Sequence, residues 1–483
     1  MIRPTRWRTA ATSALAAVLT SLAIQFTTLP CYANVGETYG FGARSSALGG
    51  AVVAGGGDAY SAYYNPGALG QEQVDSQRFK LSWGVLYMQP NFAPIEGVVK
   101  ENSFNSDRMA GSPNIGDVDT SYRATFGQVI GLSYRVLPEI RNLTVGLVTY
   151  FPLQQLAYMD TGEAYLPEYV LYRARTQRPQ FEVGMGAEAF QGLSIGAGLH
   201  VAYTLTSNAP LFINTGDRTT SAMRFTSSLK PKASPYFGMH WIPQTESKSL
   251  TFGGVLRLPV SFDNQMTLTS GARVFGKSAA IDFNFLAASA LYYDPLALEV
   301  GSTWQVTRKI RLFAQMDYQF WSAFEVPALQ IQQPQDIGAG PNMPVISAAA
   351  LPFYQFSNTV IPRVGQELAL GQSSLFRLGY AYQPSFLDGT PGDAGNYLDP
   401  PAHVFNVGFN FKFAKFLGIQ TPADLDMNLS YMHLAQQTVV KSVGNERGVL
   451  NDPKIGSTYP NLQSGYQAGG NVLGGGISLS LAI

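Results

Sequence analysis

The sequence predicts an all-β protein, a transmembrane antiparallel β-barrel, from three observations. Apolar residues alternate with small or polar residues in many short runs. Charged residues make up only 13% of the chain, whereas soluble globular proteins usually carry about 25%. After residue 33 no segment approaches the ~18 uninterrupted apolar residues of a membrane-spanning helix. Together with 49 glycines and 12% aromatic residues, these features are typical of strands with one face in lipid and one in the lumen.

The alternation has the period of two that a strand requires. In His403–Phe413 the aromatic residues Phe405, Phe409 and Phe411 share one face, while residues such as Asn406 and Asn410 share the other. The same pattern predicts strands in Phe79–Tyr87, Leu143–Phe151, Phe181–Ala189, Ser194–Leu205, Leu250–Val260, Leu296–Val306, Leu312–Phe320, Leu375–Tyr382, Leu425–Tyr431 and Ile477–Ile483. Most runs approach the ~9–11 residues that a tilted strand needs to cross a bilayer.

The first 33 residues have the pattern of a signal peptide. Three arginines, ending at Arg8, precede the apolar stretch Ala10–Phe26, and no acidic residue occurs before Glu37. We expect cleavage after Ala33, which removes the only cysteine, Cys31, and with it disulfide or zinc-thiolate chemistry. A lipoprotein signal at Cys31 is the alternative, and Pro30 argues against it.

The balance of charges argues against a nucleic-acid partner. The chain has 32 basic and 32 acidic residues, and loss of the three leader arginines leaves 29 basic residues. A nucleic-acid-binding protein needs a basic surface to displace counterions from phosphates, and no basic cluster is present. A soluble β-sandwich also alternates, but its outer face is expected to be polar rather than rich in phenylalanine.

Turn-rich segments and aromatic residues fit a barrel. The stretches Gln330–Pro344, Leu387–Pro401 and Gly444–Gly465 are predicted to be extracellular loops, because barrels keep the opposite turns short. Several aromatic residues near the ends of the runs are predicted to form an interfacial girdle: Tyr87, Tyr150, Trp304, Trp321, Tyr382 and Tyr431.

Residues 34–73 do not alternate. The segment is too rich in glycine for a spanning strand and too apolar for a disordered tail, and Gly55–Gly57 lacks the Lys-Ser/Thr of a phosphate loop. A compact plug in the lumen accounts for it, because glycines let backbones approach closely. The sequence therefore divides into a signal peptide (1–33), an N-terminal hatch or plug (34–73) and a barrel with extracellular loops (74–483).

At this segment the sequence resembles the outer-membrane long-chain fatty acid transport proteins of the FadL/TodX type. The resemblance begins at Phe41–Ala51 and continues through Asp58-Ala59 and Tyr63–Leu69. In the C-terminal half it rests on short segments in the family's order: Tyr292–Pro295, Leu298–Gly301, Val306–Leu312, Asp317–Phe324, Arg377–Tyr382 and Asp424–Tyr431. The middle, Ala157–Lys248, matches only as strands and loops.

The resemblance implies a fourteen-stranded barrel with the hatch inside its lumen. The family's Asn-Pro-Ala motif corresponds to Asn65, Pro66 and Gly67, with glycine in place of alanine. We expect Phe41 and these three residues to be hatch determinants, since Pro66 fixes φ and Asn65 can bond its own backbone. An ordinary Asn-Pro-Gly turn is the alternative.

The function implied is passive uptake of hydrophobic compounds, long-chain fatty acids first and aromatic hydrocarbons second, through loop capture, an apolar pocket and rearrangement of the hatch. By strand phase Arg135, Arg257 and Arg377 are candidates to bind a carboxylate headgroup, or else are solvated or ion-paired lumen residues. We expect a monomer in the bacterial outer membrane, surrounded by its lipid and inserted by the barrel assembly machinery, with no cofactor and no metal.

Other functions stay open at this point. A small-solute porin or an adhesin-like barrel shares the architecture, and a porin would conduct ions steadily. An outer-membrane lipid-modifying enzyme needs a nucleophile and a base. Of the histidines at 200, 240, 403 and 433, His200 lies on a small, polar face and could activate a serine, but no recognisable catalytic set is spaced near it. We therefore predict no catalytic residues.

Overall fold

The computed structural model describes most of the chain after residue 38. The described residues are 39–71 without 57, 78–100, 114–118, 122–137, 142–154, 168–169, 178–214, 222–223, 226–244, 249–274, 277–324, 330–332, 355–388, 397–414, 421–440 and 465–482. The predicted signal peptide and residues 34–38 and 72–73 of the predicted hatch lie outside them. Among the described residues, no helix is long and apolar enough to cross a bilayer.

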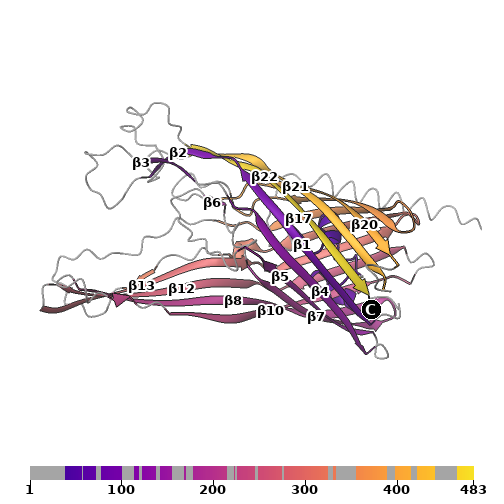
Figure 1. The fold of residues 1–483 in the computed structure, drawn as a ribbon, viewed down its shortest axis with the longest axis horizontal. Coiled ribbons are helices and arrows are strands. Elements are labelled where there is room, and N and C mark those ends of the chain that lie inside the picture. The colour runs from indigo at the N-terminus through magenta and orange to yellow at the C-terminus, as the bar shows by residue number, and fades with distance from the viewer. Residues whose placement is uncertain are drawn as a thin grey trace, which may run out of the picture.

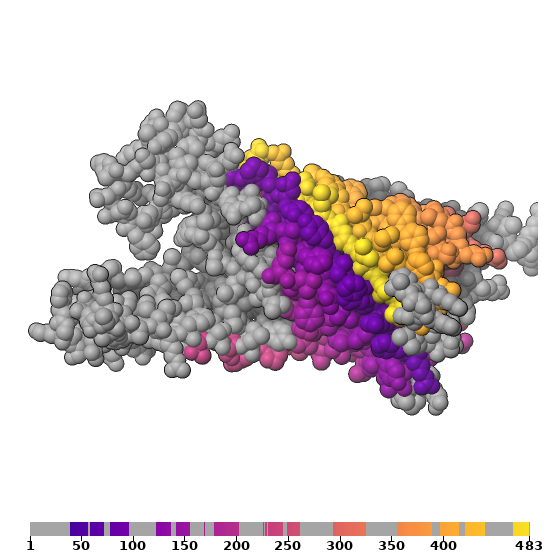
Figure 2. All heavy atoms as spheres, viewed as in Figure 1, coloured from indigo at the N-terminus to yellow at the C-terminus, as the bar shows by residue number. Residues whose placement is uncertain are grey.

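Fourteen antiparallel strands form a closed ring, as the resemblance to the FadL/TodX-type proteins implies. The ring closes where the first strand pairs with the last, from Lys80 opposite Ala482 to Phe92 opposite Gly470. Figure 2 shows these two strands, indigo and yellow, side by side on the surface. In ring order the strands are β1 (Phe79–Phe92), β4 (Thr125–Leu137), β5 (Leu143–Pro152), β7 (Gln180–Phe190), β8 (Leu193–Asn214), β10 (Thr226–Trp241), β11 (Leu250–Arg257), β14 (Ala297–Gln305), β15 (Ile310–Gln319), β17 (Thr359–Ala369), β18 (Ser374–Gln383), β20 (Ala402–Phe413), β21 (Ala423–Val440) and β22 (Gly465–Ala482).

The strands of the wall present apolar side chains outward, and many of their inward side chains are small or polar. On β20, Phe405 is 50% exposed, whereas the neighbouring Asn406 is buried. The same division separates exposed Leu378 from buried Arg377 on β18. An outer surface of this kind is stable in lipid and not in water, because apolar area left in water is costly.

The girdle prediction is wrong for two of its six residues. Tyr87, Trp304 and Tyr431 are exposed on the outer wall, and Tyr382 is partly exposed. Tyr150 and Trp321 are fully buried instead. Tyr150 lies on the inward face of β5, where Phe41 stacks on it, and Trp321 lies in the short helix η2 (Trp321–Ala323), past the end of β15.

The strands outside the ring lie at the end of the barrel that carries the long connections. They are β2 (Ile95–Lys100), β3 (Asn114–Val118), β6 (Glu168–Tyr169), β9 (Ala222–Met223), β12 (Val260–Val274), β13 (Lys277–Asp294), β16 (Gln330–Gln332) and β19 (Tyr397–Leu398). The predicted run Leu250–Val260 is thus divided, because β11 ends at Arg257 and β12 begins at Val260. In Figure 1, β8, β10, β12 and β13 extend side by side beyond the other strands.

Residues 39–71, here called the inner segment, contain the α-helices of the described chain: α3 (Ala43–Ala47), α4 (Ser61–Tyr64) and α5 (Pro66–Leu69). Nearly all of its side chains are buried. Helix α3 contacts β18, β20, β21 and β22, whereas α4 and α5 contact β5, β7, β8 and β10 across the ring. The inner segment therefore lies within the ring of strands and reaches both sides of it.

Candidate functional site

The Asn65-Pro66-Gly67 turn joins the inner segment to the wall. The Asn65 side chain caps α5, because its Oδ1 accepts a hydrogen bond from the Gly67 N–H at 2.9 Å. Its Nδ2 donates to the Val53 carbonyl at 2.7 Å and to the Met239 carbonyl of β10 at 2.8 Å. Pro66 occupies the first helical position, where its missing N–H costs nothing. One buried amide thus connects two parts of the inner segment and the wall.

The wall meets this turn with glycines. Gly186, Gly196 and Gly238 are register partners across β7, β8 and β10. A Cβ at Gly196 would lie 2.3 Å from the Pro66 carbonyl carbon, and one at Gly238 would lie 2.3 Å from Asn65 Oδ1. A Cβ at Gly67 would itself lie 2.8 Å from the Gly238 oxygen. This close approach gives a physical reason for glycine at position 67, where the family motif has alanine.

A second close approach lies on the other side of the ring. A Cβ at Gly379 of β18 would lie 2.2 Å from the Gly49 nitrogen. Gly49 has a φ of 67°, a left-handed conformation that glycine adopts without strain. Backbone therefore packs against backbone at both contacts, as the glycine content of residues 34–73 predicts.

Arginines of the wall bind carbonyl groups of the inner segment. Arg257 donates to the Tyr63 carbonyl at 2.6 Å, lies over the Tyr63 ring and pairs with Glu299. Arg363 donates to the Gly49 carbonyl at 3.0 Å and pairs with Asp317 at 2.6 Å. Each guanidinium thus has a carboxylate partner in the wall and a backbone partner in the inner segment, so it carries no unpaired charge.

Arg44 extends the ion pairs into the inner segment. It bonds Asp58 at 3.0 Å within the segment and Glu367 of β17 at 3.3 Å. Glu367 also pairs with Arg377, which in turn pairs with Asp426 of β21. Burial alone lowers the pKa of Arg44, but Glu367 and Asp58 more than offset this, so its pKa is raised and it stays charged.

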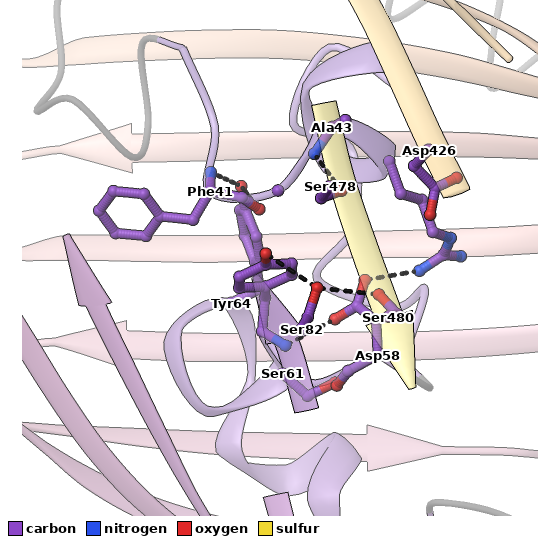
Figure 3. A network of polar contacts seen from close by, with 12 residues as sticks. Phe41, Ala43, Asp58, Ser61, Tyr64, Ser82, Asp426, Ser478 and Ser480 are labelled. Carbon is purple, nitrogen blue, oxygen red and sulfur yellow. Dashed lines mark hydrogen bonds and ion pairs between the residues drawn. The ribbon is translucent and has the colours of Figure 1, made fainter. Parts of the chain in front are cut away.

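Serines at the seam between β1 and β22 complete the contacts (Figure 3). Ser478 accepts a hydrogen bond from the Ala43 N–H at 3.2 Å. Ser82 bonds the Tyr60 hydroxyl at 2.9 Å and Ser480 at 2.8 Å. Within the segment, the Tyr64 hydroxyl accepts from the Phe41 N–H at 2.6 Å. Burial raises the pKa of Tyr64, so it stays protonated at neutral pH.

Above the inner segment, toward the long connections, the buried residues are mainly aromatic. Trp321 stacks on Phe386 with a centroid distance of 4.3 Å, and Phe324 packs against Tyr293 and Phe356. Across the mouth, Phe92 stacks on Tyr169 at 4.2 Å, with Tyr122 beside both. The parallel pairing of β6 with β19 joins connections from opposite sides of the ring.

Phe41 extends this apolar region to the inner segment. It makes an edge contact with Tyr63 at 4.6 Å and stacks on Tyr150 of the wall at 5.9 Å. Phe41, Tyr63, Tyr150, Phe92 and Trp321 belong to one hydrophobic cluster. A continuous apolar region therefore runs from the mouth of the barrel to the top of the inner segment.

Below the inner segment lies a polar cavity of about 1240 Å³. Gly55, Gly56 and Gln71 of the segment line it, and the wall contributes residues of both charges, among them Lys80, Arg311, Lys412, Glu188 and Asp424. The inner segment thus separates an apolar region from a polar one. No group of three or more His, Cys, Asp or Glu side chains suited to a metal ion occurs among the described residues.

The structure brings most of the sequence-predicted site residues to the inner segment. Phe41, Asn65, Pro66 and Gly67 are buried within it. Arg257 contacts it directly, and Arg377 reaches it through Glu367. Arg135 lies near the end of β4 and is partly buried. Its register partner is Thr144 of β5.

The role of these three arginines in binding a carboxylate ligand stays a prediction. The sequence did not indicate Arg44, Asp317, Arg363 or Glu367 as site residues. The only signal was the period of two, which puts Asp317 on the inward face of β15. The same period puts Arg363 and Glu367 together on the inward face of β17.

Comparisons with known proteins agree with this geometry. No family model matches the chain. A Pseudomonas aeruginosa FadL homologue of known structure superimposes with a TM-score of 0.56 and 13% identity, over 94% of this chain and 99% of that one. The chain has the FadL-type fold. The Pseudomonas putida toluene transporter TodX gives a TM-score of 0.50 at 12% identity, over 92% and 99% of the two chains.

A curated relative extends the similarity in sequence. Alkane uptake protein A of Marinobacter nauticus is 22% identical over 461 residues, which cover 91% of this chain and 93% of that protein. The resemblance to FadL/TodX-type proteins predicted from the sequence is confirmed.

Proposed function

We propose that this FadL-type barrel is an outer-membrane transporter for the passive uptake of hydrophobic small molecules. The observation that carries the proposal is the apolar region that ends on the inner segment, with a polar cavity on the other side. An apolar molecule is stabilised in the first region by about 25 cal/mol per Å² of buried surface. The same molecule gains no such stabilisation in the polar cavity.

The inner segment is the hatch of this transporter. Its contacts with the wall are hydrogen bonds and ion pairs at discrete points, such as Asn65, Arg257 and Arg363, rather than strand pairing. Such a segment can shift without opening the ring, because the ring's own hydrogen bonds do not include it. Cargo moves on when the hatch shifts, and several weak apolar sites favour movement over trapping.

Two classes of cargo follow. Long-chain fatty acids are the first, as the resemblance to the FadL family implies. Neutral hydrocarbons are the second, and the pairing of Arg257, Arg363 and Arg377 with wall carboxylates favours them. A fatty-acid headgroup must compete with those carboxylates for the arginines, whereas an alkane needs no cation. The similarity to an alkane uptake protein and to a toluene transporter supports the second class.

Flux into proteoliposomes tests the proposal. We expect the protein to accelerate entry of radiolabelled oleate or hexadecane and to leave sucrose entry at the level of protein-free liposomes. Faster entry of hexadecane than of oleate would identify neutral hydrocarbons as the preferred cargo. A steady ion conductance with sucrose entry, and no effect on either apolar probe, would identify a small-solute porin and refute the proposal.

The fluorescence of Trp321 locates the path. Replacing Trp83, Trp241 and Trp304 by Phe leaves Trp321 as the reporter in the part of the chain that follows the leader. A brominated fatty acid or alkane that reaches the aromatic cluster quenches it by contact. The matched control keeps the three outer tryptophans and carries Trp321→Phe, so that quenching by probe dissolved in the bilayer is measured separately.

A further inference from the structure

Three polar side chains lie on the inward face of neighbouring strands, on the mouth side of the Arg363 ion pair. They are Gln319 on β15, Thr359 on β17 and Gln383 on β18, and each is buried. We call them the polar row. The row lies between the aromatic residues near the mouth and the contact of Arg363 with the inner segment, which is the path that the proposed function assigns to cargo.

The register places the members of the polar row side by side. Gln319 and Thr359 are direct partners across β15 and β17. The segments 355–363 and 381–388 also stay adjacent, because an antiparallel ladder joins them at one end and an isolated bridge joins them at the other. Thr359 and Gln383 therefore lie close together on one face, within reach of a long side chain such as that of glutamine.

Two members of the row have hydrogen-bonding atoms that no described residue satisfies. The Thr359 hydroxyl and both the oxygen and the nitrogen of the Gln383 amide are buried without a partner. Gln319 differs, because its Oε1 accepts a hydrogen bond from Trp321 Nε1 at 2.8 Å. Buried polar atoms are nearly always paired, since leaving one unpaired is costly. Three such atoms at one place therefore indicate a site for a polar group of a ligand.

The surroundings of the row are otherwise apolar. Ala402 is the register partner of Gln383, and it is fully buried. Trp321, which bonds the row through Gln319, stacks on Phe386 at 4.3 Å. Trp321, Phe386 and Ala402 all belong to the hydrophobic cluster that continues to the inner segment. A ligand that brings a polar group to the row must therefore carry it on an apolar body.

The site has no unpaired charge to offer. On the inward face of β17 the next cation is Arg363, beyond Ile361, and it already pairs with Asp317 at 2.6 Å and donates to the Gly49 carbonyl. A carboxylate accepts hydrogen bonds but donates none, so it would leave the Gln383 oxygen unpaired and its own charge unneutralised. An alkane would leave all three atoms unpaired. A hydroxyl group donates one hydrogen bond and accepts two, which matches the atoms present.

We propose that Thr359 and Gln383 form a subsite for the hydroxyl group of a long-chain alcohol, whose chain lies in the apolar region beside Trp321 and Phe386. The inference rests on the proposed function and narrows its cargo to include hydroxylated hydrocarbons. Both polar side chains are covered in the structure, so the alcohol reaches them when the neighbouring rings move apart. The barrel then distinguishes an alcohol from an alkane of equal length.

Matched ligands test the subsite in lipid nanodiscs. Dodecanol and tridecane have equal numbers of non-hydrogen atoms and differ by a hydroxyl in place of a methyl group. Each competes with a brominated alkane that quenches Trp321 in the protein whose three outer tryptophans are replaced by Phe. We expect dodecanol to displace the quencher at a mole fraction in the nanodisc about tenfold lower than tridecane, because only the alcohol pairs the buried atoms.

Two results of this competition would overturn the proposal. Equal displacement by dodecanol and tridecane would show that water, rather than the ligand, pairs with the polar row. Stronger displacement by ionised laurate than by dodecanol would show that the region selects a carboxylate.

Variants of similar shape separate the row from the rest of the path. Gln383→Met and Thr359→Val remove the unpaired atoms, a change that apolar groups of the same shape tolerate well. We expect each to reduce the tenfold preference for dodecanol and the double variant to abolish it, with displacement by tridecane as strong as before or stronger. Gln366→Met, on the outward face of β17, is the control and should keep the preference. A folded double variant that keeps the preference would overturn the proposal.

Wild-type protein gives an independent measurement. A long-chain alcohol with a photoreactive diazirine next to its hydroxyl group is expected to label the peptides that contain Thr359 and Gln383, and dodecanol is expected to prevent this labelling better than tridecane. Labelling of other peptides of the barrel without these two would refute the inference even if every variant failed to fold. Labelling at these peptides without accelerated entry of dodecanol, oleate or hexadecane into proteoliposomes would refute the proposed function alone.

Discussion

Replacement of Asn65 by alanine is expected to loosen the hatch without opening the ring. The wild-type side chain makes three hydrogen bonds, to the Gly67 N–H and to the carbonyls of Val53 and Met239. A buried hydrogen bond contributes about 1 kcal/mol net, so their loss costs about 3 kcal/mol. Since 1.4 kcal/mol is a factor of ten, the ratio of unseated to seated hatch rises by about two orders of magnitude.

Ion conductance across a planar bilayer measures this change. The wild-type channel is expected to be closed for most of the recording, and Asn65→Ala is expected to show openings that occupy a far larger fraction of it. Asn65→Asp separates the contributions, because a carboxylate still accepts from Gly67 but donates to neither carbonyl. It is expected to open almost as often as the alanine variant.

A control for the stability of the ring makes the result decisive. The ring itself is monitored by the temperature at which the folded band disappears on gels, which should change little, because Asn65 takes no part in strand pairing. If Asn65→Ala conducts no more than the wild type while remaining folded, the inner segment is not held by this turn and the reasoning fails.

The remaining predictions concern the wall. Gly379→Ala places a Cβ 2.2 Å from the Gly49 nitrogen, which costs about 1–3 kcal/mol and is expected to raise the ion conductance. The control is Gly254→Ala, whose Cβ meets no atom closer than 3.4 Å. Equal conductance of the two variants would contradict the close-packing argument. Arg363→Gln leaves a buried carboxylate unpaired, a loss of about 3–5 kcal/mol that should lower the unfolding temperature on gels, whereas exposed Arg308→Gln should leave it unchanged; equal stability of both variants would show that the buried pair is not needed.

The sequence was most informative where a strand has lipid on one side. The run predicted at His403–Phe413 corresponds to β20, Ala402–Phe413, within one residue. Three ring strands were missed: β4, β10 and β17. Strand β10 contains Lys230, Pro231 and Lys232 near the mouth, where the outer face leaves the lipid and the apolar signal ends. Strand β17 has Pro362 on its outer face and Arg363 and Glu367 on its inner face.

The inner segment was predictable in kind but not in its contacts. Glycine content indicated close packing, and Asn-Pro-Gly indicated a capped turn. Nothing local, however, indicates that Arg363 binds Gly49, 314 residues away in sequence. Such pairs depend on which strands face one another across a closed ring, and that information lies in the register of all fourteen strands. For the same reason the two inward aromatics, Tyr150 and Trp321, were placed on the wrong surface.

The serine contacts at the seam have a consequence for biogenesis. Ala43 reaches Ser478 across 435 positions of sequence, and that serine lies on the strand that closes the ring. The residues that are synthesised first therefore cannot complete their hydrogen bonds until the last strand has paired with β1. Closure of the ring and completion of this contact between the inner segment and the wall therefore occur in the same step.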